Sequence, residues 1–347
     1  LRAPDAHQGT RPAACGTQRL PRRSRAKAAV RMNTPGRHHG ADEAEQMGIL
    51  DRLEEGDPQS IGVGYAQALL DQGAPRRPVC DMPGPDPVDF DAVYAEVLAK
   101  GRGQLSPATA VRAVQAASEL PFFEGLKRER DLFSELMATD QRHGLIHAFF
   151  SERAVSKLPE LQGIAPRDVK MIGVIGGGTM GAGIATAALL SGFAVTLIEM
   201  SDAAAKAARD RIEGNLGGAL KRGKLSQEQY DDLTQKALTL ATDYKALSNT
   251  DLVIEAVFED MAVKKDVFAK LDAVCKQGAV LATNTSYLDV NEIAASTSRP
   301  QDVIGLHFFS PAHVMKLLEV VVADKTAPDV VATAFALGKA MRKVAVR

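Results

Sequence analysis

Two polar residues interrupt apolar stretches near the C-terminus, and their types suit acid–base chemistry. His307 follows an apolar run at 303–306, and Glu319 lies inside a second run at 317–321. Both runs are typical of buried strands. A buried carboxylate without a partner is costly, so Glu319 is either half of a structural pair or part of a working site. An imidazole that titrates near neutral pH suits general-base work, and a neighbouring carboxylate can orient it.

A glycine-rich segment at 176–181 is the second chemical signal. It reads GGGTMG, which satisfies the pattern G-x-G-x-x-G; an apolar stretch precedes it and an alanine-rich stretch follows. In a strand–turn–helix, such glycines let backbone N–H groups approach a pyrophosphate. The alternative is a glycine turn that only packs a helix on a strand.

Glu199 extends this signal toward a particular cofactor. It ends the next apolar stretch, 23 residues after Gly176 (199 − 176). A carboxylate there can accept hydrogen bonds from the ribose hydroxyls of adenosine, and it would repel a 2′-phosphate. The sequence therefore predicts NAD rather than NADP, unless Glu199 is merely a solvated residue.

The elements that must position these residues alternate between strands and helices from residue 169 onward. Strands are predicted at 170–175, 194–199, 252–256, 279–283, 303–308 and 317–322. Helices are predicted to begin at Met180, Asp202, Ala262 and Asn291, with an extra helical pair at 202–222 and 226–239. This alternation predicts an α/β fold, a Rossmann-type doubly wound and mostly parallel sheet, preceded by a helical linker region.

The overall composition excludes several other classes of protein. The 347 residues are 45% hydrophobic and 24% charged, and the net charge of −1 favours neither nucleic acid nor an acidic membrane as a partner. No apolar run reaches the roughly 18 residues needed to span a membrane. The three cysteines lie far apart, so no metal site is predicted. The first 40 residues carry nine Arg or Lys and one acid, and we expect a disordered or non-native leader there, or a transit peptide.

Four segments together carry a resemblance to a known family. They read VIGGGTMGAGIA, DLVIEAVFEDMAVKKDVFAKLD, LATNTSYL and GLHFFSPAHVMKLLEVV. With them, residues 169–346 resemble the NAD-binding domain of 3-hydroxyacyl-CoA dehydrogenases, as found in multifunctional fatty-acid oxidation proteins. The resemblance implies oxidation of L-3-hydroxyacyl-CoA to 3-oxoacyl-CoA with NAD in fatty-acid β-oxidation. The alternatives are an NAD-binding fragment without turnover and another β-hydroxyacid-type NAD dehydrogenase, which would use a lysine base.

The resemblance also assigns roles to individual residues. His307 matches the catalytic base, Glu319 the carboxylate that orients it, and Ser286 a contact of substrate and nicotinamide. Ser310 stands where the family often has asparagine. Lys264 and Lys265 are candidates for contacts with CoA phosphates, with a solvated helix face as the alternative. The cofactor-binding positions implied in this way are Gly176, Gly178, Met180, Gly181, Glu199, Val257, Glu259, Lys264, Ser286 and Ser310.

The same resemblance predicts how the chain is organised. Residues 41–84 resemble the last helices of a hydratase domain, 85–165 a helical linker and 166–347 the NAD-binding domain, whereas 1–40 resemble none of these. We expect a chain truncated at both ends, without a hydratase core and without the C-terminal helical domain through which the intact protein would form a dimer. An acyl-CoA substrate is expected, and the predicted location is cytoplasmic, with mitochondrial and peroxisomal locations left open.

Overall fold

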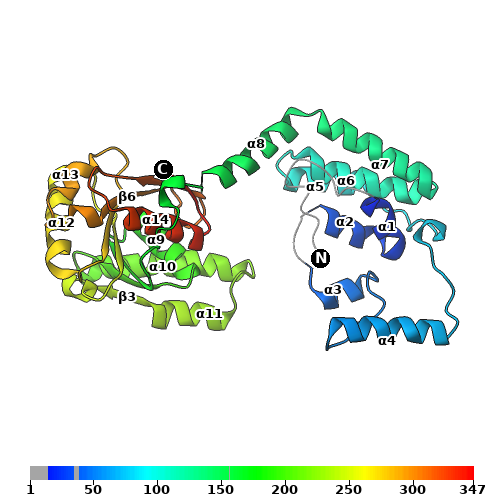
Figure 1. The fold of residues 1–347 in the computed structure, drawn as a ribbon, viewed down its shortest axis with the longest axis horizontal. Helices are drawn as coiled ribbons and strands as arrows, with labels where there is room; N and C mark the ends of the chain where they lie inside the picture. Colours follow the sequence, from blue (N-terminus) through cyan, green and yellow to red (C-terminus); the bar gives the residue numbers. More distant parts are fainter. Residues whose placement is uncertain (1–14, 35–38, 156) are drawn as a thin grey trace. The chain divides into compact units, whose positions relative to one another are not determined.

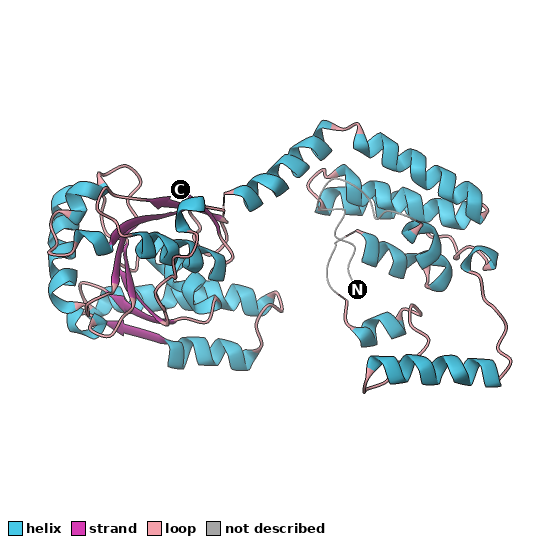
Figure 2. Ribbon diagram, in the orientation of Figure 1, coloured by secondary structure: helices cyan, strands magenta, loops and turns pink. Residues whose placement is uncertain are grey.

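The computed structural model describes residues 15–34, 39–155 and 157–347. The chain divides into two compact units, Leu1–Ser151 and Glu152–Arg347. Helix α8 (Asp140–Ala154) runs through the boundary between them. The first unit is helical and the second holds all the strands of the described residues (Figure 2).

An eight-stranded sheet forms the centre of the second unit. Its strand order is β3-β2-β1-β4-β5-β6-β7-β8, and every neighbouring pair is parallel except β6 and β7. The predicted mostly parallel, doubly wound sheet is confirmed. The strands are β1 (Met171–Ile175), β2 (Ala194–Ile198), β3 (Leu238–Ala241), β4 (Leu252–Glu255), β5 (Val280–Thr283), β6 (Val303–Phe308), β7 (Leu317–Val321) and β8 (Val344–Val346).

Helices cover both faces of this sheet, as parallel strands require. The apolar cluster on one face contains residues of α9 (Thr179–Leu190), α10 (Asp202–Lys221) and α14 (Pro328–Ala340). The cluster on the other face contains residues of α12 (Met261–Val274) and α13 (Val290–Ala294). Shorter elements are α11 (Gln227–Asp232), the 3₁₀ turns η3 (Pro159–Leu161), η5 (Tyr244–Leu247) and η6 (Pro300–Asp302), and the π-helical turn η4 (Leu233–Ala237).

Alternation along each strand decides which side chains meet which helices. On β4, Leu252 and Ile254 belong to the α9 side, whereas Val253 belongs to the α12 side. Glu255 therefore points toward α12, because successive side chains of a strand point to opposite faces. This places a carboxylate at the end of a central, fully buried strand.

Two predictions about the sheet are wrong in detail. The helix predicted at 226–239 ends earlier, because Leu238 and Thr239 begin strand β3, which pairs with β2. Strand β8 was not predicted; it adds to the sheet beside β7. Both are edge strands of three or four residues. A strand this short has too few residues for its alternation of apolar and polar side chains to be distinguished from the periodicity of the adjacent helix. The remaining strand bounds agree with the prediction within one residue.

Four helices of the first unit pack against α6 (Leu105–Glu119), most of whose residues are buried. They are α1 (Gly16–Arg23), α2 (Ala26–Asn33), α5 (Phe90–Lys100) and α7 (Phe122–Met137). The unit also contains α3 (Ala41–Gln46), α4 (Pro58–Asp71) and the 3₁₀ turn η2 (Val79–Asp81). Figure 1 shows α1 and α2 as two separate short helices.

The expectation of a disordered leader at 1–40 is wrong for residues 15–34, which form α1 and α2. Ala29 of α2 is fully buried and shares an apolar cluster with Val111 and Val114 of α6. The buried carboxylate of Glu129 accepts a hydrogen bond from the N–H of Cys15 (3.0 Å) and another from the hydroxyl of Thr17 (2.6 Å). Buried alanines hold α2 against α6, and the hydrogen bonds to Glu129 hold the start of α1. Residues 1–14 and 35–38 of the predicted leader lie outside the described residues.

Candidate functional site

His307 and Glu319 form a hydrogen-bonded pair across two antiparallel strands. They occupy directly opposite positions of β6 and β7, which puts both side chains on the same face. The Nδ1 of His307 lies 2.7 Å from the Oε2 of Glu319. Since Nδ1 is engaged, the other ring nitrogen, Nε2, is the one that can meet a substrate proton.

The burial of this pair differs from the prediction for Glu319. The side chain of His307 is 19% exposed, whereas that of Glu319 is 47% exposed. Its neighbour on the same face of β7, Val321, is also exposed. The apolar pattern of 317–321 correctly predicts a strand, but only Leu318 and Val320, on the opposite face, are buried under α14.

The glycine loop joins β1 to α9 at the point where the strand order reverses, between β1 and β4. Gly176 has φ of +88°, a conformation that favours glycine. A Cβ on Gly181 would lie 1.7 Å from the carbonyl oxygen of Gly176, so the helix can start this close to the turn only without a side chain. A Cβ on Gly178 would meet no atom within 4 Å, so the loop is open at Gly178.

Glu199 lies beside this loop, as its spacing predicted. Its Oε1 accepts a hydrogen bond from the N–H of Gly177 (2.6 Å), and its Oε2 accepts one from the N–H of Met200 (3.1 Å). A cavity of about 460 Å³ opens next to Glu199 at the carboxyl ends of β1, β2 and β4. It is lined by Ile175, Gly176, Gly178, Ile198, Glu199, Met200, Thr242, Tyr244, Ala256, Val257, Phe258, Val263, Asp266, Val267 and Lys270.

The chemistry of this cavity suits a dinucleotide. Its lining is largely apolar, with a carboxylate at Glu199 and the open glycine turn at its edge. The free N–H groups at the start of α9 can receive a phosphate, and a carboxylate can receive ribose hydroxyls. The residues present therefore fit NAD.

A second polar group lies at the ends of β4 and β5. The Nζ of Lys264, from α12, donates to Oε1 and Oε2 of Glu255 (2.8 and 3.0 Å) and lies 3.1 Å from the Oε2 of Glu259. Glu259 Oε1 in turn accepts from the N–H of Ser286 (2.9 Å) and from the hydroxyl of Thr285 (2.5 Å). The predicted residues Glu259, Lys264 and Ser286 are thus brought together by direct contacts.

The ammonium group of Lys264 lies neither on a solvated helix face nor where it could contact a CoA phosphate, the two predicted positions. Its side chain is 1% exposed and its donors are directed at two carboxylates, so it is not available to a CoA phosphate. Lys265 is 41% exposed but pairs with Glu292. Burial raises the pKa of the Glu259 carboxyl, but the hydrogen bonds from Thr285 and Ser286 and the pairing with Lys264 lower it by more, so its pKa lies below the ordinary value.

The other predicted site residues are Val257, Met180 and Ser310. Val257 lines the cavity, and its N–H donates to Oε1 of Glu255 (2.7 Å). Met180 is partly buried and packs against the core on the α9 side. Ser310 is exposed in the segment between β6 and β7.

Two residues of the site were missed by the sequence reasoning. Glu255 is fully buried, and Asn284 accepts from the N–H of Phe308 (2.8 Å), the residue after His307. A signal for Glu255 was present: it is the one charged residue of an apolar strand, which is the feature that drew attention to His307. Asn284 had no such signal, because asparagine after a strand is usual in turns.

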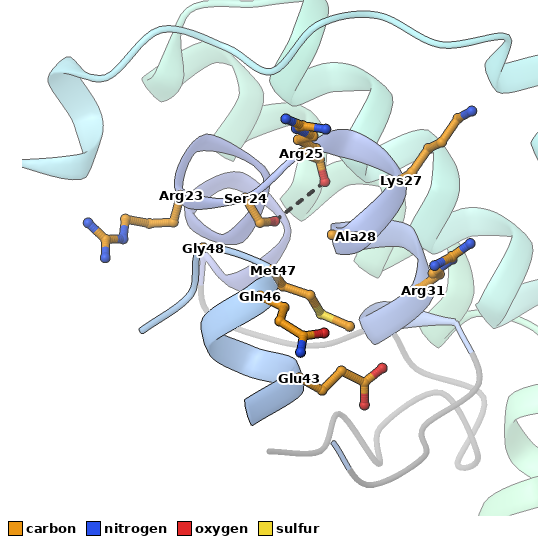
Figure 3. Close-up of a pocket in the computed structure, with 10 residues that line it drawn as sticks. All are labelled: Arg23, Ser24, Arg25, Lys27, Ala28, Arg31, Glu43, Gln46, Met47 and Gly48. Atoms are coloured by element: carbon orange, nitrogen blue, oxygen red, sulfur yellow. Dashed lines mark hydrogen bonds between the residues drawn. The ribbon is translucent and has the colours of Figure 1, made fainter. Parts of the chain in front are cut away.

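A hollow in the first unit is lined by the basic residues Arg23, Arg25, Lys27 and Arg31. Figure 3 shows Arg23 extending to one side and Lys27 and Arg31 to the other, so these side chains do not converge on one point.

Within the described residues, no group of three or more His, Cys, Asp or Glu side chains could hold a metal ion. None of the described helices has both the length and the hydropathy of a membrane span.

Comparisons with known proteins agree with this geometry. Residues 171–347 match the family described as "3-hydroxyacyl-CoA dehydrogenase, NAD binding domain". The chain is 42% identical to a peroxisomal bifunctional enzyme of Cavia porcellus over 99% of its own length and 48% of that protein. It is 34% identical to a glyoxysomal fatty acid beta-oxidation multifunctional protein of Brassica napus over 100% of its length and 49% of that protein.

These matches have two consequences. The chain spans about half the length of the curated relatives it matches. Because the match to the Cavia porcellus protein covers 99% of the chain, it includes most of residues 1–40. The expectation that this segment resembles none of the family's proteins is therefore wrong.

Solved structures match about half of the chain. A 3-hydroxybutyryl-CoA dehydrogenase from Escherichia coli is 45% identical, with a TM-score of 0.50, over 52% of this chain and 38% of that one. The dehydrogenase part of multifunctional enzyme 1 from C. elegans is 31% identical, with a TM-score of 0.50, over 57% of this chain and 47% of that one.

Proposed function

Because the chain belongs to the 3-hydroxyacyl-CoA dehydrogenase family through its NAD-binding domain, we propose that it oxidises L-3-hydroxyacyl-CoA to 3-oxoacyl-CoA in fatty-acid β-oxidation. The observation that carries this proposal is the 2.7 Å contact between Nδ1 of His307 and Oε2 of Glu319. A secondary alcohol can lose hydride only if a base takes its hydroxyl proton. The pair supplies that base at the end of a strand.

The proton is assigned to His307. Its Nδ1 donates to Glu319, which fixes the tautomer in which Nε2 carries a lone pair. Nε2 removes the hydroxyl proton of the substrate, and the carboxylate of Glu319 stabilises the imidazolium that results. When bound, NAD supplies the hydride acceptor for the hydrogen on C3, and the balanced products are the 3-oxoacyl thioester, NADH and a proton.

The other polar residues bind and orient. Glu199 receives the ribose hydroxyls of adenosine and disfavours a 2′-phosphate. Gly176, Gly178 and Gly181 give the pyrophosphate access to the start of α9, where Met180 also contacts the cofactor. Ser286, held by Glu259, contacts the substrate oxygen near the nicotinamide. Ser310 contributes a further contact to the cofactor. Val257 forms the wall of the cavity.

A second candidate function is NAD binding without turnover. The observation that favours it is the 47% exposure of Glu319, because a solvated carboxylate stabilises an imidazolium less than a buried one does. A third, a dehydrogenase with a lysine base, would leave His307 without a role.

The test is NADH oxidation with acetoacetyl-CoA by this chain, its His307→Ala variant, and a longer version that continues beyond Arg347. Turnover in the chain that His307→Ala abolishes supports the proposal. Turnover that survives His307→Ala would indicate the lysine-base enzyme. If this chain binds NADH without turnover and the longer version turns over, residues 1–347 are the cofactor-binding part. If neither protein oxidises NADH, the proposal is overturned.

Further proposals concern the rest of the protein. We propose that residues 41–84 correspond to the last helices of a hydratase domain, 85–165 to a helical linker and 166–347 to the NAD-binding domain. We also propose an acyl-CoA substrate and a dimeric intact protein, which sedimentation of that protein tests. A cytoplasmic location is the proposal from sequence; the peroxisomal and glyoxysomal names of the relatives favour an organelle, and fractionation of the source cells decides between them.

A further inference from the structure

Glu255 is a buried charge that neither the proposed reaction nor the proposed cofactor contacts use. Its side chain is fully buried at the end of β4, on the α12 side of the sheet. Its two oxygens accept four hydrogen bonds: two from Lys264, one from the N–H of Val257 (2.7 Å) and one from the hydroxyl of Thr283 (2.7 Å). Every oxygen of this carboxylate is therefore engaged.

Stability alone does not account for such a pair. Removing two charges from water costs several kcal/mol per ion, and an apolar pair of similar volume is often as stable or more so. Apolar residues would have sufficed, because the side chains packed around this end of the sheet include Val253, Leu281 and Phe268. We therefore look for the role of this buried ion pair in the groups to which Glu255 and Lys264 are hydrogen-bonded.

The groups that it holds belong to two different walls of the proposed site. On one side, Glu255 fixes the N–H of Val257, which lines the cofactor cavity. On the other side, Lys264 reaches Glu259, and Glu259 accepts from the N–H of Ser286. The register of the sheet places Glu255 directly beside Thr283, two residues before Thr285, whose hydroxyl also donates to Glu259.

We propose that Glu255 is a positioning residue that couples the cofactor-binding segment 256–259 to the segment 284–288 that carries Ser286. This inference rests on the proposed function and deepens it: occupation of the cofactor cavity orders Ser286 through Glu255, Lys264 and Glu259. Cofactor binding and serine placement are then one linked event, transmitted through contacts that are already in place.

Hydrogen exchange with NADH as the probe tests this coupling. In the wild-type chain, NADH should slow exchange in the peptides covering 256–259 and also in those covering 284–288. In Glu255→Gln, NADH affinity should fall about tenfold, which is a moderate coupling energy, and NADH should no longer protect 284–288. Peptides covering 176–181 should still be protected at saturating NADH, because the glycine loop is held by other contacts.

Two further variants separate positioning from stability. Val253→Ala removes buried apolar volume from the same strand, so it lowers thermal stability without touching the polar network. It should leave NADH-induced protection of 284–288 in place. Thr283→Val removes one hydrogen bond to Glu255 at nearly constant volume, together with the one that the hydroxyl of Thr283 accepts from the N–H of Thr285 (3.3 Å). A partial loss of NADH affinity in this variant is therefore the readout that keeps the test decisive if Glu255→Gln does not fold.

The outcomes distinguish this inference from the proposed function. If the wild-type chain does not bind NADH, the proposed function and this inference both fail. If the wild type binds NADH but Glu255→Gln and Thr283→Val show the same affinity and the same protection of 284–288, only the coupling is overturned. Equal losses in Val253→Ala and Glu255→Gln would also overturn it, because they would reduce Glu255 to a structural group.

Discussion

Nδ1 of His307 lies 2.7 Å from Oε2 of Glu319, and the two residues occupy directly opposite positions in the antiparallel pair β6 and β7. A shift of one residue in this register would turn one of the side chains to the other face of the sheet. The pairing of these strands is therefore what brings the two side chains together.

The first prediction concerns Glu319→Gln. The amide oxygen can still accept a hydrogen bond from Nδ1, but the stabilising charge is lost, so kcat should fall about a hundredfold. Measured under conditions where the chain or its longer version turns over, NADH affinity should stay unchanged. A loss in NADH affinity with unchanged kcat would show that Glu319 serves the cofactor instead.

A second prediction contrasts two glycines of the same loop. Gly178→Ala should leave thermal stability unchanged, because a Cβ there meets nothing within 4 Å and φ is −63°. It should nevertheless weaken NADH binding about tenfold or more, because the methyl group occupies the space proposed for the pyrophosphate.

Gly181→Ala is the matched control for that variant. Its Cβ would lie 1.7 Å from the carbonyl oxygen of Gly176, so it should destabilise the second unit by about 1–3 kcal/mol or more. Thermal denaturation and NADH titration of both variants provide the comparison. Unchanged NADH affinity in Gly178→Ala would place the pyrophosphate elsewhere.

The third prediction concerns cofactor choice at Glu199. Glu199→Gln keeps a group that can accept from the N–H of Gly177 but removes the negative charge that would repel a 2′-phosphate. NADPH binding should improve relative to NADH by about tenfold. Titration with each reduced cofactor measures the ratio, and a ratio equal to that of the wild type would contradict the assignment.

The fourth prediction is a pH dependence of stability caused by His313. Burial, together with the nearby charges of Lys343 and Arg222, lowers the pKa of His313 below its ordinary value of 6.5. Its Nδ1 is buried and has no hydrogen-bond partner within the described chain. The neutral imidazole is therefore the form that the folded state prefers.

The sign follows from which state binds the proton. Below about pH 6.5 the unfolded chain takes up a proton that the folded chain resists, so the free energy of unfolding falls as pH drops toward the lowered pKa. His313→Gln should lose less stability than the wild type between about pH 7 and pH 5.5. Parallel stability curves for the two proteins, from denaturant unfolding, would refute this assignment.

Much of the fold could be predicted because its signals are local. The strands around β1 and β2 are apolar runs, and the glycine pattern lies between such a strand and a helix, so neither depends on distant residues. Strand β3 could not be predicted in this way. Leu238 and Thr239 become a strand only because β2 offers an unpaired edge, and the helical pattern that precedes them does not reveal that edge.

The candidate site divides along the same line. His307, Glu319 and Glu199 were predictable because a polar group at an apolar strand has few alternatives. The pairing of Lys264 with Glu255 was not predictable, because a lysine near the start of a helix usually points to solvent. Burial of that lysine depends on α12 packing over the end of β4.

The sequence by itself determined the alternation of strands and helices, the glycine turn, and the types of residue available for acid–base chemistry. Periodicity and residue type act over a few positions, so they can be read without the fold. Only the tertiary structure decided that Glu319 is half-exposed, that Lys264 is buried between two carboxylates, and that Glu129 fixes the basic helix α1. Burial and pairing depend on residues that are distant in the chain, and their positions follow from packing.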